Sequence, residues 1–479
     1  MRTTIVPLFF AATLAGCPGP VSSDAGADIP RLMGRVSPIN LSPTVTFEGT
    51  RRFVGALGPA MGEDDLSAAV PAAPAGSGVV IEQHVCTRIR CVFVARIDDT
   101  QPNRGAAISE PSAAVPVDIR ISGSMFDYTA RLNVVPADTA DAVTMGTGEI
   151  TGEAVYSSLT LPAGATLRAT MQEQPVRIAV LGAVQLQGRV DLSPSATRPG
   201  AGGHAGGTAP MGDGQGPSAG LGNAGAGGGG GHATAGAAGM AAAGAPGGAG
   251  GAVSTRRRLD GGSGGGAGGG AAGGHGGGAF LLAGFHTMDL TGARFVLTGA
   301  AGQGSAGGGA GGMLLLAGEV SGAFAADVRG GAGGTAAGAV GGAGGNGRVR
   351  IEGNAGTATL EGATVERGPR FDLASVVPIV RDAQVSLRGS AAPGARVRVD
   401  GTRLDATAFT STVVADASGA WTASVRLPEG VVQIMLTDVT DPMMPLVGMH
   451  GTRIVVRGDA GARTIAGGAI DIAYLPVDG

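Results

Sequence analysis

Two cysteines, Cys86 and Cys91, are close enough in the sequence to react with each other. They enclose Thr-Arg-Ile-Arg and belong to two apolar stretches that alternate as strands do. In an oxidising compartment we expect a disulfide that closes a hairpin. The alternatives are a redox site of the CxxC type or half of a metal site. The four-residue gap fits neither of these, and no His-rich segment lies nearby in the sequence.

Other residue types used in catalysis lack the spacing that catalysis needs. Gly216–Gly220 and Gly261–Gly265 match G-x-S-x-G, but both lie in Gly/Ala tracts, where a strand-to-helix elbow is not expected. No H-x-x-x-H or H-E-x-x-H spacing links the six histidines, which are His84, His204, His232, His275, His286 and His450. Three of them, His204, His232 and His275, would meet if the long Gly-rich tract folded back, but scattered surface histidines are the default expectation. All 33 basic residues are Arg, so lysine chemistry is excluded. We expect no catalytic, metal or cofactor site.

Charged pairs occur at positions that alternation places on an outer sheet face. Arg189 and Asp191 form one such pair, and Asp327 and Arg329 form another. We expect surface ion pairs, and the alternative is a site of carbohydrate chemistry, which needs grouped carboxylates. Arg256-Arg257-Arg258 is the one basic cluster, and it suits either an anionic lipid surface or an exposed loop.

The elements that must position these residues are short apolar runs between about Val176 and Gly368. Gly277–Gly284 is echoed 34 residues later by Gly311–Gly318 and again, 35 residues after that, by Asn346–Gly353. A fixed period of this size indicates a repeat architecture. We therefore predict an all-β chain with a glycine-rich parallel β-solenoid (β-helix-like) at residues 144–370. The Gly/Ala tract 200–278 is expected to be a long flexible loop, and ordered packing of Gly-rich strands or polyproline-II-type helices is the alternative.

Two β-sandwich-like domains are expected to flank the solenoid. The first covers 31–143, and its expected strands are 44–47, 79–86, 91–97, 117–122 and 128–135. The second covers 371–479, with turns at Pro393-Gly394 and Asp416–Gly419. Its alternating strands resemble a bacterial Ig-like module, and Trp421, the only Trp, is the expected core residue.

Residues 1–17 have the pattern of an export signal: Arg2, a short apolar run, and Leu14-Ala15-Gly16-Cys17. This ending resembles a bacterial lipoprotein lipobox, which implies cleavage before Cys17 and attachment of lipid to it. Residue 18 is Pro where an inner-membrane retention signal would have Asp, so we expect the outer membrane and the cell surface. Residues 18–30 are an expected linker. An ordinary secretory signal with a chance Cys is the alternative.

The composition favours a structural or adhesive protein. The chain has 92 Gly, and its stretch of about 148–368 resembles glycine-rich (PGRS-like) exported surface proteins of Gram-negative bacteria. The net charge of −4 gives no case for nucleic-acid binding. We expect a non-enzymatic, lipid-anchored surface protein that contacts the membrane through Cys17 and has a polysaccharide or a surface protein as its ligand. The alternatives are a β-helix carbohydrate-active enzyme (polysaccharide lyase or hydrolase) and a pure surface spacer.

Overall fold

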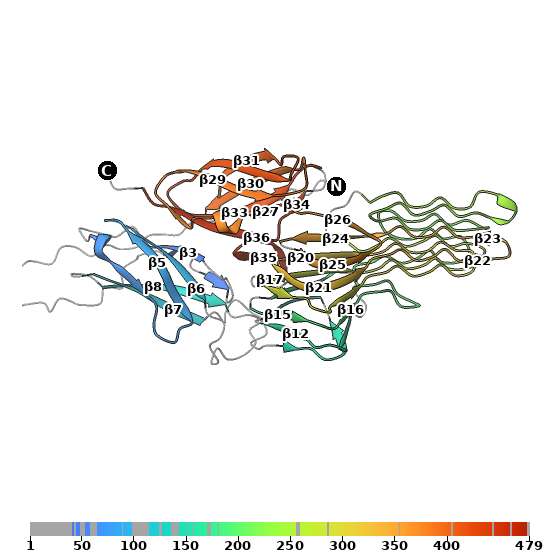
Figure 1. Ribbon diagram of the computed structural model, residues 1–479, viewed down its shortest axis with the longest axis horizontal. Helices are drawn as coiled ribbons and strands as arrows, with labels where there is room; N and C mark the ends of the chain where they lie inside the picture. The colour runs from blue at the N-terminus through green and yellow to red at the C-terminus, as the bar shows by residue number, and fades with distance from the viewer. Residues whose placement is uncertain are drawn as a thin grey trace, which may run out of the picture. The chain divides into compact units, whose positions relative to one another are not determined.

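The protein is almost all β in its computed structural model, with 44% strand and 3% helix, as the alternating apolar patterns predict (Figure 1). The structure describes residues 41–42, 45–47, 53–57, 65–88, 90–97, 115–123, 127–135, 143–150, 152–156, 158–169, 174–180, 182–254, 259–284, 287–353, 355–403, 406–442, 445–459 and 462–476. The expected signal peptide, Cys17 and the expected linker lie outside these ranges. In the described chain, no helix has both the length and the apolar character needed to cross a membrane.

Residues from Leu41 to Val135 contribute two four-stranded sheets. One has the order β1-β3-β6-β5, with bounds β1 (Leu41–Ser42), β3 (Phe53–Leu57), β6 (Cys91–Ile97) and β5 (Val79–Cys86). The other has the order β2-β8-β7-β4, with bounds β2 (Val45–Phe47), β8 (Asp127–Val135), β7 (Val115–Ser122) and β4 (Val70–Ala72). A short 3-10 turn, η1 (Leu66–Ala68), precedes β4. The five strands expected here are confirmed as β2, β5, β6, β7 and β8, within two residues at each end.

From Val143 to Glu366 the strands pair in parallel, except for the antiparallel pair of β22 (Thr335–Ala336) and β23 (Ala339–Val340), and the chain returns repeatedly to the same sheets. From β9 to β18, each strand pairs with the strand three positions later, as β11 does with β14 and β14 with β17. Strand β21 then pairs with both β18 and β19. The bounds are β9 (Val143–Thr144), β10 (Gly148–Ile150), β11 (Glu153–Tyr156), β12 (Leu159–Leu161), β13 (Thr166–Ala169), β14 (Val176–Val180), β15 (Val184–Leu186), β16 (Arg189–Asp191), β17 (Ala279–Gly284), β18 (Met288–Asp289), β19 (Arg294–Val296), β20 (Met313–Ala317), β21 (Val320–Asp327), β24 (Gly347–Glu352), β25 (Ala355–Glu361) and β26 (Ala363–Glu366).

The three sequence repeats lie side by side as β17, β20 and β24. Phe280 pairs with Leu314, which pairs with Val349, so equivalent residues of the repeats are stacked in register. These side chains point into one continuous core, where Phe295 also packs, 6.0 Å from the ring of Phe280. The opposite face of β17 and β20 is buried as well, in a second apolar cluster that includes Leu281. Burial of both faces explains why β17 and β20 are continuous apolar runs.

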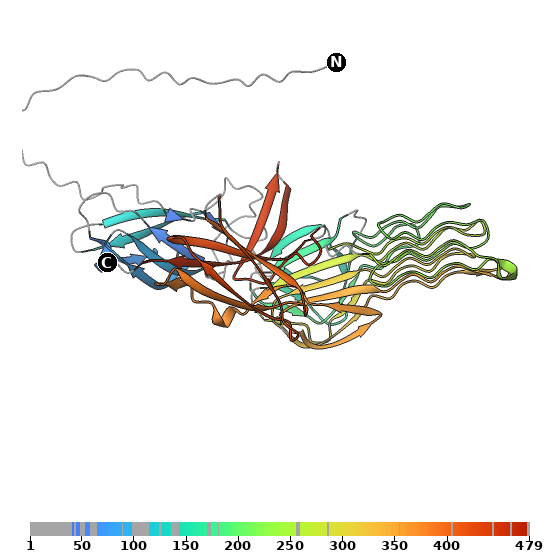
Figure 2. The same cartoon turned by 90° about the horizontal axis from the view of Figure 1, so that it is seen from above.

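The Gly/Ala tracts that leave this core are ordered, so the expected flexible loop at 200–278 is wrong. Their backbone amides bond to other segments with a period of three residues: Gly227 and Gly230 donate to Ser305 and Gly308, while Gly228 and Gly231 donate to Leu221 and Ser218. A period of three without internal bonding is typical of the polyproline-II-type helix. Figures 1 and 2 show these extended runs side by side. The tracts, which we call the glycine bundle, are residues 200–254, 259–278, 297–312 and 328–347.

The innermost runs of the glycine bundle are surrounded on all sides. Run 305–312 exchanges amide bonds with runs on every side of it. These neighbours are runs 226–232, 260–268, 271–278, 297–303, 328–334 and 340–347. Six neighbours around one extended chain amount to hexagonal packing, and every residue of run 305–312 is buried.

Close packing of these runs is possible because their inner residues have no side chain. A Cβ atom built on Gly307 would lie 1.9 Å from the carbonyl oxygen of Gly228, and one on Gly229 would lie 2.0 Å from that of Ala343. The buried runs are accordingly rich in glycine with a few buried alanines, such as Ala306 and Ala310, whereas alanines such as Ala238 lie on exposed outer positions. Glycine loses the most backbone entropy on folding, and the hydrogen bonds between runs offset that loss. Short elements at the ends of runs are η3 (Ala242–Gly244), β22 (Thr335–Ala336) and β23 (Ala339–Val340).

The C-terminal residues form a three-stranded and a seven-stranded sheet with a shared core. Trp421 is buried in that core with Phe371 at 6.2 Å, so its expected role as a core residue is confirmed. The expected turns are present, and Gly394 and Gly419 adopt the positive φ that the turns need. The bounds are β27 (Arg370–Phe371), η4 (Leu373–Ser375), β28 (Ile379–Val380), β29 (Gln384–Ser390), β30 (Arg396–Arg403), β31 (Ala406–Val414), β32 (Ala420–Arg426), β33 (Gly430–Asp438), β34 (Leu446–Val447), β35 (Arg453–Asp459) and β36 (Ala462–Tyr474).

Candidate functional site

The densest group of polar side chains lies where the glycine bundle joins the parallel strands. His232 is buried there, and its Nδ1 lies 2.8 Å from the carbonyl oxygen of Gly311, just before β20. The carbonyl of His232 accepts from the amide of Ser254, and the carbonyl of Ser254 accepts from the guanidinium of Arg348 on β24. Arg348 also pairs with Glu366 on β26 at 3.0 Å. These contacts join three runs of the bundle to two strands, so we call this group the root cluster.

Electrostatics keep His232 neutral in the root cluster. Burial, together with the positive charge of Arg348, lowers the pKa of His232 to about 4. The carboxylate of Asp260 and the bond to the Gly311 carbonyl oppose that shift without reversing it. His204 lies nearby, with its Nε2 3.5 Å from Asp260. A neutral imidazole that is buried suits a structural role better than proton transfer.

The structure brings together some of the histidines that lie far apart in the sequence. His204 and His232 belong to one neighbourhood, and the Nδ1 of His275 accepts from the amide of Gly206 inside the bundle. The default expectation of loose surface histidines is wrong for His232 and His450, which are buried, and holds for the exposed His84. The sequence signal was weak, because His232 is one polar residue within a run of glycine and alanine.

The two serine motifs serve the packing of the bundle. The amide of Ser218 donates to Oγ of Ser263 at 3.2 Å, so the serines of the two G-x-S-x-G matches contact each other. Both side chains are buried, and neither lies on a turn between a strand and a helix. A substrate cannot reach either hydroxyl, so these two motifs do not form a nucleophile site.

Charged pairs line the outer face of β16 and β21, as alternation predicted. Arg189 bonds to Asp191 at 2.7 Å, and Arg329 bonds to Asp327 at 2.6 Å and to Glu361 at 3.0 Å. Burial alone would raise the pKa of Asp327, but bonds from Arg329 hold it below its ordinary value. An Asp that stays ionised in this way cannot act as a general acid near neutral pH.

A buried ion pair that the sequence did not indicate lies on β24. Arg350 and Glu352 pair with side chains that are 1% and 0% exposed. Arg350 also donates to the carbonyl of Val447 in β34, and Glu352 accepts from the amide of Met449, just after β34. A pair of this kind fixes the position of a contact.

The expected disulfide joins Cys86 and Cys91. The two residues face each other across the β5–β6 hairpin, with 4.0 Å between their Cα atoms. The turn between them is closed by a bond from the amide of Thr87 to the carbonyl of Arg90. The bond ties the two strands together and leaves no free thiol here for redox or metal chemistry.

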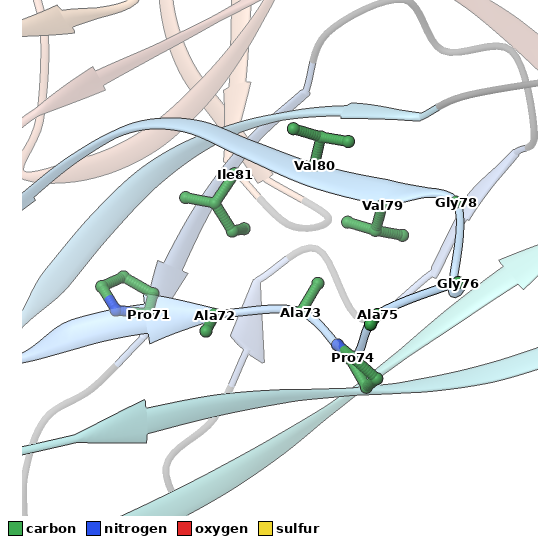
Figure 3. Close-up of a pocket in the computed structure, with 10 residues that line it drawn as sticks. All are labelled: Pro71, Ala72, Ala73, Pro74, Ala75, Gly76, Gly78, Val79, Val80 and Ile81. Atoms are coloured by element: carbon green, nitrogen blue, oxygen red, sulfur yellow. The ribbon is translucent and has the colours of Figure 1, made fainter.

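A pocket lies between β4 and β5 (Figure 3). Figure 3 shows Val79 and Ile81 beside the Pro71–Ala75 segment. All ten lining residues are Pro, Ala, Gly, Val or Ile: Pro71, Ala72, Ala73, Pro74, Ala75, Gly76, Gly78, Val79, Val80 and Ile81. No lining side chain can ionise or form a directed hydrogen bond, so this pocket can hold an apolar group but cannot catalyse a reaction.

Within the described ranges, no three His, Cys, Asp or Glu side chains are grouped closely enough to hold a metal ion. No protein-family model, curated protein or solved structure matches the chain. The function is therefore argued from the residues of this chain alone.

Proposed function

We propose that this protein is a lipid-anchored cell-surface protein with a structural or adhesive, non-enzymatic role. The observation that carries the proposal is the glycine bundle. Its interior is held by backbone hydrogen bonds, and in the described tracts only Asp213, Asp260 and Arg329 carry a full charge. Such a body has a defined shape and few groups that could do chemistry, which suits presentation at a surface.

The bundle needs a stable base, and we interpret the parallel strands as a β-solenoid. Three strands per turn, in-register pairing and one continuous apolar core support this interpretation. One turn of a solenoid cannot bury its own apolar face, so stacked turns stabilise each other. The glycine tracts leave after β16, β19 and β21 and return before β17, β20 and β24, so each loop is anchored at both ends. We interpret the C-terminal sheets as a bacterial Ig-like module that acts as a spacer or adhesive unit.

Anchoring is proposed through lipid on Cys17, in the outer membrane with the protein on the cell surface. The support is the Leu14-Ala15-Gly16-Cys17 sequence and the Pro at 18. Each buried methylene adds about 0.8 kcal/mol to membrane affinity, so several acyl chains would hold the protein firmly. The resemblance to glycine-rich (PGRS-like) surface lipoproteins agrees with this placement.

A carbohydrate-active enzyme is the second candidate, because of one observation. Val296 of β19 pairs with both Asp191 and Asp327, so the two carboxylates lie in one row, two strands apart. Two strand spacings are roughly 9.6 Å. This separation is near that of inverting glycosidases, at roughly 6.5–9.5 Å. Both carboxylates are already paired with arginines, which favours the non-enzymatic proposal.

One experiment separates these candidates. The full chain with Cys17→Ser is incubated with bacterial and plant polysaccharides, and both retention and new chain ends are measured. Retention without new chain ends supports an adhesive role. If the polysaccharides are neither retained nor cleaved, the spacer role is supported. New ends that are lost in Asp191→Ala or Asp327→Ala, but not in an Asp213→Ala control, would overturn the non-enzymatic proposal.

A further inference from the structure

We infer that the outer run 233–241 of the glycine bundle is a contact surface for a second copy of this chain. Two sides of this run are hydrogen-bonded within the molecule. The amides of Gly236 and Gly239 donate to Gly251 and Gly248, and those of Ala237 and Met240 donate to Ala343 and Val340. The third side is formed by the amides of Ala235 and Ala238, which have no backbone acceptor among the described residues.

The open side is uncharged and easily approached. Ala235 and Ala238 are exposed, and their methyl groups let another backbone come near. Met240, at the end of the same run, is 54% exposed. This side of the run therefore presents backbone amides that are available for hydrogen bonding, as an open edge strand of a sheet does.

The spacing of the open amides selects the partner. Amides three residues apart in a polyproline-II-type helix are about 9.3 Å apart, at 3.1 Å per residue. A β-strand presents groups on one side about every 6.8 Å, at 3.4 Å per residue, so it does not match. A second threefold chain with small side chains matches, and this protein carries one on its own surface.

The contact already exists inside the molecule in an equivalent form. Run 233–241 packs antiparallel to run 245–254 through the Gly236 and Gly239 amides. Two copies related by a two-fold axis would set run 233–241 antiparallel to itself, so the same surface serves both partners. No residue of this run is charged, so no like charges would face each other. Anchoring in one membrane would raise the local concentration and strengthen a weak contact.

The test uses the full chain with Cys17→Ser, without membrane or polysaccharide, so its result does not depend on the proposed function. Light scattering during size-exclusion chromatography should give twice the chain mass at high concentration, and Ala238→Glu should return the mass to that of one chain. Under mild oxidation, Ala238→Cys should cross-link at least about tenfold faster than Ala252→Cys, which is exposed on run 245–254. A single-chain mass at every concentration, or equal cross-linking of the two variants, would overturn the inference.

Discussion

Replacing Gly307 by Ala should destabilise the protein although it adds one methyl group. The new Cβ would lie 1.9 Å from the Gly228 carbonyl oxygen, where real Cβ contacts stay beyond 3.0 Å, so the two runs must separate by about 1.1 Å. That movement stretches the two bonds between these runs, from Gly227 to Ser305 and from Gly230 to Gly308, now 3.0 and 2.9 Å long. Overpacking costs about 1–3 kcal/mol and each weakened bond about 1 kcal/mol.

We therefore expect a loss of about 3–5 kcal/mol, with calorimetry as the assay. For a unit of this size, about 1 kcal/mol lowers the melting temperature by 2–4 °C, so the shift should be roughly 6–20 °C. Gly148→Ala is the matched control, because its Cβ meets nothing within 4 Å, and it should change stability by less than about 0.5 kcal/mol. Equal melting temperatures for the two variants would refute the close packing of the glycine runs.

Three further predictions follow from the described contacts. Stability should fall by about 3 kcal/mol as the pH drops from 6.5 towards 4, because His232 is protonated in the unfolded chain before it is protonated in the folded one. In urea titrations, His232→Gln should lack this part of the pH dependence. Phe295→Ala should cost about 3–5 kcal/mol in the same titrations, since Phe295 is fully buried between Phe280 and Phe324. Reduction of Cys86–Cys91 should lower stability only modestly, by about 1–3 kcal/mol, because the disulfide closes a short loop; a loss of all structure on reduction would contradict this.

Much of the strand pattern could be predicted from the sequence. From Val184 to Leu192 every second residue, starting with Val184, is buried, and the residues between them are not. This is the pattern that the period of two in a strand predicts. The 34-residue repeat also predicted which strands become neighbours, since Phe280 and Leu314 are stacked in register. Alternation can be read from the residues of one strand, and the repeat spacing from the residues of two similar strands.

The glycine bundle could not be predicted in the same way. Its order depends on hydrogen bonds between runs far apart in the chain, such as that from Gly227 to Ser305, and glycine has no side chain to mark such a partner. The root cluster was missed for a related reason. His232 and Arg348 are more than a hundred residues apart, and only the folding back of the long tract brings them together.

Hydrogen exchange at the glycine amides tests the central claim most directly. The proposed surface role depends on a bundle with a fixed shape, which requires that the amides of the buried runs 226–231, 261–268 and 305–312 are bonded. We predict that these amides exchange as slowly as those of β17 and β20. Exchange at the rate of an unfolded chain, with β17 and β20 still protected, would mean that the tracts are flexible loops and would contradict the account.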